Sequence, residues 1–334
     1  MRPDLDFLKR HPILCLFLLT PGIPEYLSSS SPLNAIVLNP LQFAFQLSAN
    51  AALYLPGALL IREAMIRWRK GWATVLLLGA AYGILEEGIA LSTLYNPTAH
   101  PVGKLGYFGH FLGVSWVWTA GILLVHMVYS IALPILLLGL ALPGTRGVSL
   151  VGGRGIKVAF CVLAADVTFL SSLITFGTHF WMGWSVFLGS WIAIGALILV
   201  VRMVPPGIVH AREGGPKIGK VTAFFLGLAF FVFILFPEQL PLGAHFPPIT
   251  SILMMYVLEG GLLLLVVRNV GSLGNERILV ALALGILLPI CVFGVAAELS
   301  LPFTLAGDVL MIWFLRKLWK KYTPAPALGE PIPV

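Results

Sequence analysis

The sequence predicts an all-α protein, a polytopic bundle of about ten transmembrane helices with both termini in the cytoplasm. Composition is the first observation: of the 334 residues, 58% are hydrophobic and only 10% are charged, and the mean hydropathy is +0.95. A soluble domain carries roughly 25% charged residues, so a soluble fold of this length would lack charges for its surface. The second observation is that long apolar runs recur from one end of the chain to the other.

Each apolar run of about 20 residues is long enough to cross the hydrocarbon core of a bilayer. The first run follows a basic start and contains Pro21 and Pro24, which predicts a short or broken helix that stays in the protein. The spans make up one transmembrane domain, residues 1–321, and a short tail, residues 322–334, that is predicted to be disordered. The predicted spans are residues 12–28, 41–65, 72–95, 115–142, 157–176, 180–201, 220–237, 248–267, 278–298 and 301–315.

The basic residues predict the orientation. All but one of the 21 lysines and arginines lie in six short clusters in alternate loops, and the exception is Lys104. Cytoplasmic loops carry the excess of Lys and Arg, so all six clusters are expected on the cytoplasmic side of a plasma membrane. One cluster contains Arg62, which is predicted to pair with Glu63. Basic residues at the ends of the spans contact anionic lipid headgroups. The net charge of +7 is therefore explained by the lipid bilayer as partner, and no nucleic acid is expected.

Five carboxylic acids lie away from the ends of the predicted spans. An ionised group at the centre of a transmembrane helix costs about 2.5–3.5 kcal/mol, so each must be protonated, paired or turned toward a polar interior. Such residues are functional candidates by default. Glu259 and Asp308 are candidates to line a cavity, whereas the position of Asp166 favours a pairing or capping role. The five acids are Glu86, Glu87, Asp166, Glu259 and Asp308.

Glu86 and Glu87 lie together in the third predicted span. Successive residues of an α-helix are about 100° apart, so the two carboxylates are expected to point in different directions. Glu87 continues a stripe formed by Gly79 and Gly83, and small residues let a neighbouring helix approach closely. Glu87 is therefore predicted to hydrogen-bond to that neighbour. Glu86 shares a face with Tyr82 and is predicted to face a cavity.

The next span carries His126 at a depth of about 16 Å, close to that of the two glutamates. The polar residues around it recur at helical spacing, so this face is expected to turn toward the bundle interior. A carboxylate beside an imidazole suits general acid/base chemistry, although such a pair can also only lock two helices together. The predicted catalytic residues are Glu86, Glu87 and His126, and the second set of cavity candidates is Tyr82, His179, Glu259 and Asp308.

The pair Glu86-Glu87 and His126, on consecutive spans, resembles the first two motifs of the CAAX-protease and bacteriocin-processing family, the glutamate-type intramembrane endopeptidases. The family motifs read Glu-Glu-x-x-x-Arg, then Phe-x-x-x-His, then His-x-x-x-Asn. In this sequence Leu91 stands at the arginine position and Ile122 at the phenylalanine position.

The third family motif has its counterpart at His179, with Gly183 at the asparagine position. The resemblance covers residues 72–183. It implies that one of the two glutamates activates a water molecule for attack on a peptide carbonyl, and that His126 holds this water or steadies the oxyanion.

Three functions remain open from the sequence. An acid/base cluster in a dry setting favours an intramembrane endopeptidase that acts on a membrane-embedded peptide. Acids at mid-depth equally suit a proton-coupled secondary transporter or permease for a small molecule. The third alternative is a non-catalytic membrane scaffold. The sequence specifies neither a metal nor a cofactor, and it contains no Walker, haem-attachment or HExxH motif.

Overall fold

The computed structural model confirms the predicted all-α, polytopic helix bundle. It describes residues 10–31, 33–206, 208, 218–270, 276–297 and 301–322. The first half of the chain forms α2 (Pro12–Pro21), η1 (Gly22–Leu27), α3 (Ala35–Leu38), α4 (Pro40–Trp68), α5 (Trp72–Gly83), η2 (Ile84–Ala90), η3 (Gly103–Gly106), β1 (His110–Phe111), β2 (Val114–Ser115), α6 (Trp116–Val125), η4 (His126–Ala132), α7 (Leu133–Ala141) and η5 (Pro143–Thr145). The second half forms α8 (Gly153–Thr178), α9 (Trp184–Met203), α10 (Lys220–Gly243), α11 (Pro248–Val270), α12 (Glu276–Ala297) and α13 (Leu301–Lys321).

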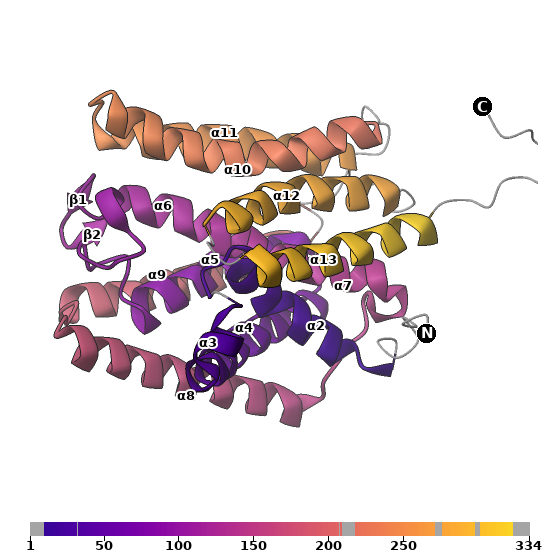
Figure 1. Ribbon diagram of the computed structural model, residues 1–334, viewed down its shortest axis with the longest axis horizontal. Coiled ribbons are helices and arrows are strands. Elements are labelled where there is room, and N and C mark those ends of the chain that lie inside the picture. The colour runs from indigo at the N-terminus through magenta and orange to yellow at the C-terminus, as the bar shows by residue number, and fades with distance from the viewer. Residues whose placement is uncertain are drawn as a thin grey trace, which may run out of the picture.

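The long helices lie side by side in one bundle, with α11 along one edge and α8 along the opposite edge (Figure 1). The span Trp72–Ala90 lies in the interior, since 78% of its most apolar window is buried, against 22% for α8 and 17% for α9. The outer helices expose large apolar side chains such as Phe160 and Phe176. Such surfaces suit contact with lipid tails, so the helix that carries the two glutamates is shielded from lipid by its neighbours.

Eight helices in the described part of the chain are long and apolar enough to cross a membrane. They coincide with the second to ninth predicted spans. The first predicted span is the shorter apolar helix Pro12–Leu27, as its prolines indicated. The last is α13, whose 21 residues include Asp308 and end in a basic run. The chain is therefore a multi-pass membrane protein with eight to ten spans, and its orientation stays a prediction.

The third predicted span was too long at its C-terminal end. The helix ends at Ala90 rather than at residue 95, because the chain turns at Ser92, which has a left-handed φ of 59°. The loop that follows contains η3 and a short antiparallel hairpin, in which His110 pairs with Ser115. The predicted disordered tail lies outside the described residues apart from Tyr322, as do residues 1–9 of the predicted domain.

Glycines allow α10 and α12 to pack backbone against backbone. A Cβ atom at Gly285 would collide with the carbonyl of Phe224, and one at Gly227 with the carbonyl of Leu282. Small residues at such crossings let two transmembrane helices approach closely, which is where their packing energy comes from. This contact holds together two of the four C-terminal helices.

Gly285→Ala is therefore expected to destabilise the protein by about 1–3 kcal/mol, the usual cost of overpacking. Gly260→Ala in α11 is the matched control, since a Cβ atom there meets nothing within 4 Å. That control should be neutral or stabilising by up to about 1 kcal/mol, because alanine favours a helix over glycine. Equilibrium unfolding in mixed micelles measures both, and equal effects of the two variants would contradict the close crossing.

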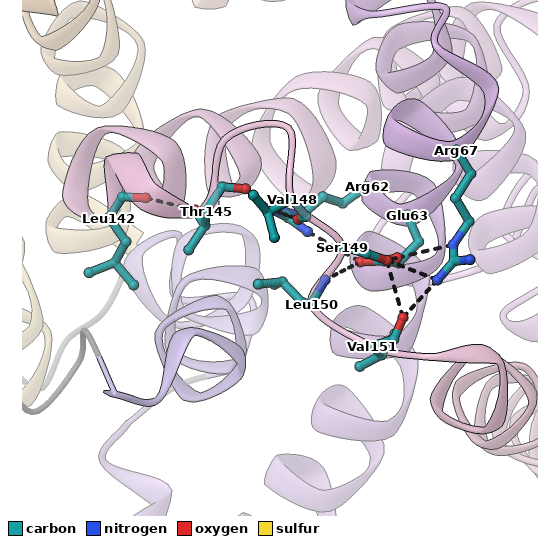
Figure 2. Close-up of polar contacts among 9 residues, drawn as sticks. All are labelled: Arg62, Glu63, Arg67, Leu142, Thr145, Val148, Ser149, Leu150 and Val151. Atoms are coloured by element: carbon teal, nitrogen blue, oxygen red, sulfur yellow. Dashed lines mark hydrogen bonds and ion pairs between the residues drawn. The ribbon is translucent and has the colours of Figure 1, made fainter.

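The predicted ion pair at the end of α4 is confirmed. Arg62 Nη1 lies 3.3 Å from Glu63 Oε1, and both side chains are almost fully buried. The other guanidinium nitrogen, Nη2, donates to the carbonyl oxygens of Thr145 at 2.5 Å and Val148 at 2.9 Å. The pair therefore fixes the loop between α7 and α8 against the end of α4 (Figure 2).

Candidate functional site

The site residues lie on π-helical turns. Glu86 and Glu87 lie in η2, His126 begins η4, and η1 carries a further carboxylate, Glu25. A π-turn inserts one residue into a helix and re-aims the side chains around it, and such turns are frequent at functional sites. In this fold each of these three turns continues an α-helix, so the side-chain spacing of a regular α-helix does not hold at the site residues.

His126 lies between the two glutamates. Its Nε2 atom is 2.9 Å from Glu87 Oε1, and its Nδ1 atom is 3.1 Å from Glu86 Oε2. The Nδ1 atom also lies 3.0 Å from Ser130 Oγ. Glu86, Glu87 and His126 are 1%, 8% and 4% exposed. The structure therefore brings together all three predicted catalytic residues in one buried cluster, called the Glu-His-Glu cluster below.

The sequence indicated that the two carboxylates point in different directions, yet both reach the same ring. The two nitrogens of an imidazole lie on different edges, so carboxylates that point apart can each reach one of them. The expectation that only Glu87 would contact the neighbouring helix was too narrow, since Glu86 also contacts His126. The π-turn η2, which no periodicity in the sequence revealed, contributes to this arrangement.

Close helix packing positions the histidine. A Cβ atom at Gly79 would come within 3.0 Å of the Cα atom of Met127, and one at Gly83 within 3.2 Å of the Cβ atom of His126. The small-residue stripe therefore lets η4 approach α5, as predicted. This short separation is what allows the Nε2 atom of His126 to reach Glu87 on the next turn.

The hydrogen bonds of His126 fit more than one protonation state. Nε2 donates to Glu87, whereas Nδ1 either accepts a hydrogen bond from the hydroxyl of Ser130 or, in the protonated ring, donates to it. Nδ1 also lies 3.1 Å from Glu86 Oε2, which is ion-pair distance for a protonated ring. A buried carboxylate beside an imidazole is an arrangement that suits proton transfer.

Polar side chains extend the cluster on both sides. Thr93 Oγ1 donates to Glu87 Oε2 and receives a hydrogen bond of 3.3 Å from Trp118 Nε1. On the other side, the Tyr82 hydroxyl interacts with Glu86 but has no partner at good hydrogen-bond geometry. The ring of Tyr82 meets that of His126 edge-on at 6.2 Å. Tyr82 therefore belongs to the site, as predicted.

The other cavity candidates lie elsewhere. Glu259 is buried on α11 and interacts with Tyr129, and Asp308 is buried on α13 and hydrogen-bonds to Cys291. No described contact joins either acid to the Glu-His-Glu cluster. His179 follows the last residue of α8 with a φ of 54° and is exposed. Because His179 lies exposed at the C-terminal end of α8, the histidine of the third family motif is not brought to the site.

Two further acids interact with Glu86. Asp166 on α8 does so electrostatically, although the sequence favoured a pairing or capping role for it. Glu25, in the first predicted span, was missed as a site residue. It interacts with both Glu86 and His126. The rule that marks acids inside predicted spans as functional candidates finds Glu25 when it is applied to residues 12–28.

The three cluster residues also fit a metal ion by position. Each offers one ligand atom, and these atoms lie within 4.8 Å of one another. Carboxylate and imidazole ligands suit several divalent metals. A metal ion would bind a ring nitrogen of His126 that carries no proton. The site residues therefore fit proton chemistry and, by position, a metal ion as well.

Comparisons with known proteins add no relative. No family model, no curated protein and no solved structure matches this chain. The fold and the site thus define its class without a homologue: a multi-pass membrane protein whose buried helices hold a Glu-His-Glu cluster.

Proposed function

We propose that this protein is an intramembrane hydrolase that cleaves peptide bonds with the Glu-His-Glu cluster. The observation that carries the proposal is that two carboxylates from a single π-turn hold both nitrogens of one buried histidine. A base and a proton donor are thereby fixed side by side where little water competes, which favours general acid/base catalysis. The resemblance of these residues to glutamate-type endopeptidases supports the same chemistry.

Glu86 is the better base of the two glutamates. Both oxygens of Glu87 already accept hydrogen bonds, one from His126 and one from Thr93. In contrast, the Oε2 atom of Glu86 is buried and accepts no hydrogen bond, although Nδ1 of His126 lies 3.1 Å away at ion-pair distance. This oxygen can therefore accept a proton from a water molecule. Glu87 then fixes the ring of His126, as a carboxylate commonly does beside a catalytic histidine.

The proposed reaction restores the protonation state of the Glu-His-Glu cluster. Glu86 takes a proton from a water molecule as the water oxygen attacks the peptide carbonyl, and protonated His126 steadies the oxyanion. His126 next gives its proton to the leaving amide nitrogen as the carbon–nitrogen bond breaks. Glu86 then passes the proton it took to Nδ1 of His126, 3.1 Å away. The cluster ends as it began.

A cleavage assay with proteoliposomes tests this function. Glu86→Gln, Glu87→Gln and His126→Ala are each expected to reduce cleavage of a library of single-span peptides at least about 100-fold, the usual contribution of general acid/base groups. Glu238→Gln is the matched control, because Glu238 is also a buried glutamate but faces Gly121 on α6. Cleavage by all three cluster variants at the rate of the control would refute the proposal.

A proton-coupled transporter is the second candidate. It is favoured by the additional acids, Glu25 and Asp166, which interact with Glu86 across helix boundaries. A set of linked acids at mid-depth is typical of proton relays. Solute flux that follows an imposed pH gradient and is lost in Glu86→Gln, in a protein that cleaves none of the peptides, would establish this alternative.

A further inference from the structure

A second polar centre surrounds Glu25 in η1. The hydroxyl of Tyr54 on α4 donates to Glu25 Oε1 at 2.5 Å, and the hydroxyl of Ser31 donates to Oε2 at 2.7 Å. Ser31 in turn receives a hydrogen bond of 3.0 Å from Asn50. Both carboxylate oxygens therefore have defined partners, which hold the side chain in one position.

Two tyrosines connect this centre to the Glu-His-Glu cluster. The rings of Tyr54 and Tyr82 lie 6.1 Å apart, and Tyr82 in turn meets His126. Both tyrosines are at most 3% exposed. The Tyr82 hydroxyl and Glu86 Oε2 are buried, interact with each other, and lack partners at good geometry. Buried polar atoms of this kind are commonly satisfied by an internal water molecule.

A turn of serines links η1 to the protein surface. The hydroxyl of Ser28 lies 2.8 Å from that of Ser30, and its single proton also has the backbone carbonyl oxygens of Pro24 and Glu25 within reach. Ser30 is exposed, whereas Ser28 and Ser31 are buried. Ser29 donates to the carbonyl oxygen of Gly294 on α12 at 3.0 Å, which fixes the turn. Glu25 itself is only partly buried, so it lies near the surface beside this turn.

We propose that Glu25 is the carboxylate through which the Glu-His-Glu cluster exchanges protons with the outside of the helix bundle. One proton leaves Glu86 for the Tyr82 hydroxyl, whose own proton passes through a water molecule to Tyr54. The hydroxyl proton of Tyr54 moves along its existing hydrogen bond to the Glu25 carboxylate, so both tyrosines and the water are restored. Glu25, which is only partly buried, then releases the proton at the surface beside the serine turn.

This role rests on the proposed function only in that the cluster must gain and lose protons, which a transporter requires as well. Glu25 acts through other residues and is a positioning and proton-transfer residue rather than a catalytic one. The ionisable groups described as interacting with it are Tyr26 on its own turn, Tyr54 on α4, Tyr82 on α5, Glu86 on η2 and His126 on η4.

Hydrogen–deuterium exchange followed by infrared spectroscopy tests the path. The carboxyl and imidazole bands of the cluster are assigned with the Glu86→Gln and His126→Ala variants, and their shift is timed after the buffer is changed to D₂O. Glu25→Gln and Tyr54→Phe are each expected to slow this shift at least about tenfold, since each removes a proton-transfer group. Glu25→Asp, which keeps a carboxyl group, should exchange close to the wild-type rate. Glu238→Gln should do so as well.

The outcomes separate this inference from the proposed function. Wild-type exchange rates in both Glu25→Gln and Tyr54→Phe would overturn the path, even if the cluster variants abolish peptide cleavage. Slow exchange in these two variants, in a protein that cleaves no peptide, would support the path and reject the hydrolase. A variant that does not fold is recognised by its unfolding midpoint, and the other variant then decides.

Discussion

Replacing His126 by alanine is expected to lower the free energy of unfolding by about 3–5 kcal/mol, the cost of breaking a buried ion pair from one side. The variant leaves Glu86 and Glu87 adjacent, buried and without the cation that lies between them. Equilibrium unfolding in mixed micelles measures the loss. Ser130→Ala is the control, because it removes only a neutral partner of the same ring nitrogen and should cost about 1 kcal/mol.

The second half of this experiment removes the glutamate charges as well. In the triple variant Glu86→Gln, Glu87→Gln, His126→Ala no buried charge is left without a partner, so at least half of the lost stability should return. If the triple variant is as unstable as His126→Ala alone, the loss comes from a packing defect rather than from electrostatics. A loss below about 1 kcal/mol in the single variant would mean that the cluster is not held as an ion pair.

The same variants address the scaffold alternative. Strong stability coupling among the three residues, together with unchanged cleavage and flux, would mean that the cluster only holds two helices together. Stability and activity are separable here, because Glu86→Gln keeps the shape of the side chain while it removes the base. A variant that stays folded and loses activity therefore excludes a purely structural role.

Hydropathy and depth predicted most of the fold and the centre of the site. Apolar runs of membrane-spanning length are a direct consequence of bilayer thickness, and each predicted span contains a helix in the described part of the chain. Glu86, Glu87 and His126 were found because acids and a histidine at matching depth on consecutive antiparallel helices must lie close together. The glycine stripe correctly indicated which face of the helix is packed.

What the sequence did not reveal depends on local departures from regular helices. The π-turns η1 and η2 have no periodic signature in the sequence, so the contact of both carboxylates with the ring of His126 was not predicted. The contact between Glu25 and Tyr54 was not foreseen, because the two residues lie 29 positions apart in the chain. The distance of His179 from the cluster follows from its exposed position at the end of α8, which the spacing of the motifs does not determine.

The second large effect is expected at Glu63, the centre of the contacts in Figure 2. Its carboxylate accepts hydrogen bonds from the backbone N–H of Leu150 at 2.7 Å and from the hydroxyl of Ser149, and it pairs with Arg62. Glu63→Gln would leave the guanidinium of Arg62 buried without its counter-charge. The expected loss is about 3 kcal/mol in the free energy of unfolding, together with faster amide exchange at Leu150.

Arg67→Gln is the matched control for this charge. Arg67 pairs with the same carboxylate at 3.2 Å, but its side chain is 42% exposed, whereas that of Arg62 is 3% exposed. An exposed ion pair contributes at most about 1 kcal/mol, so this variant should be close to wild type. Equal losses in Glu63→Gln and Arg67→Gln would show that burial does not set the strength of these contacts.

The loss at Glu63 should also spread beyond α4, because the loop that it holds bridges two parts of the bundle. Arg146, in the same loop, pairs with Glu276 at the start of α12 at 3.1 Å and donates to the hydroxyl of Tyr322 after α13. When Glu63→Gln frees one side of the loop, the other side loses a fixed anchor. Faster amide exchange is therefore expected at the start of α12 as well as at Leu150. Faster amide exchange at Leu150 alone would mean that the loop does not couple α4 to α12.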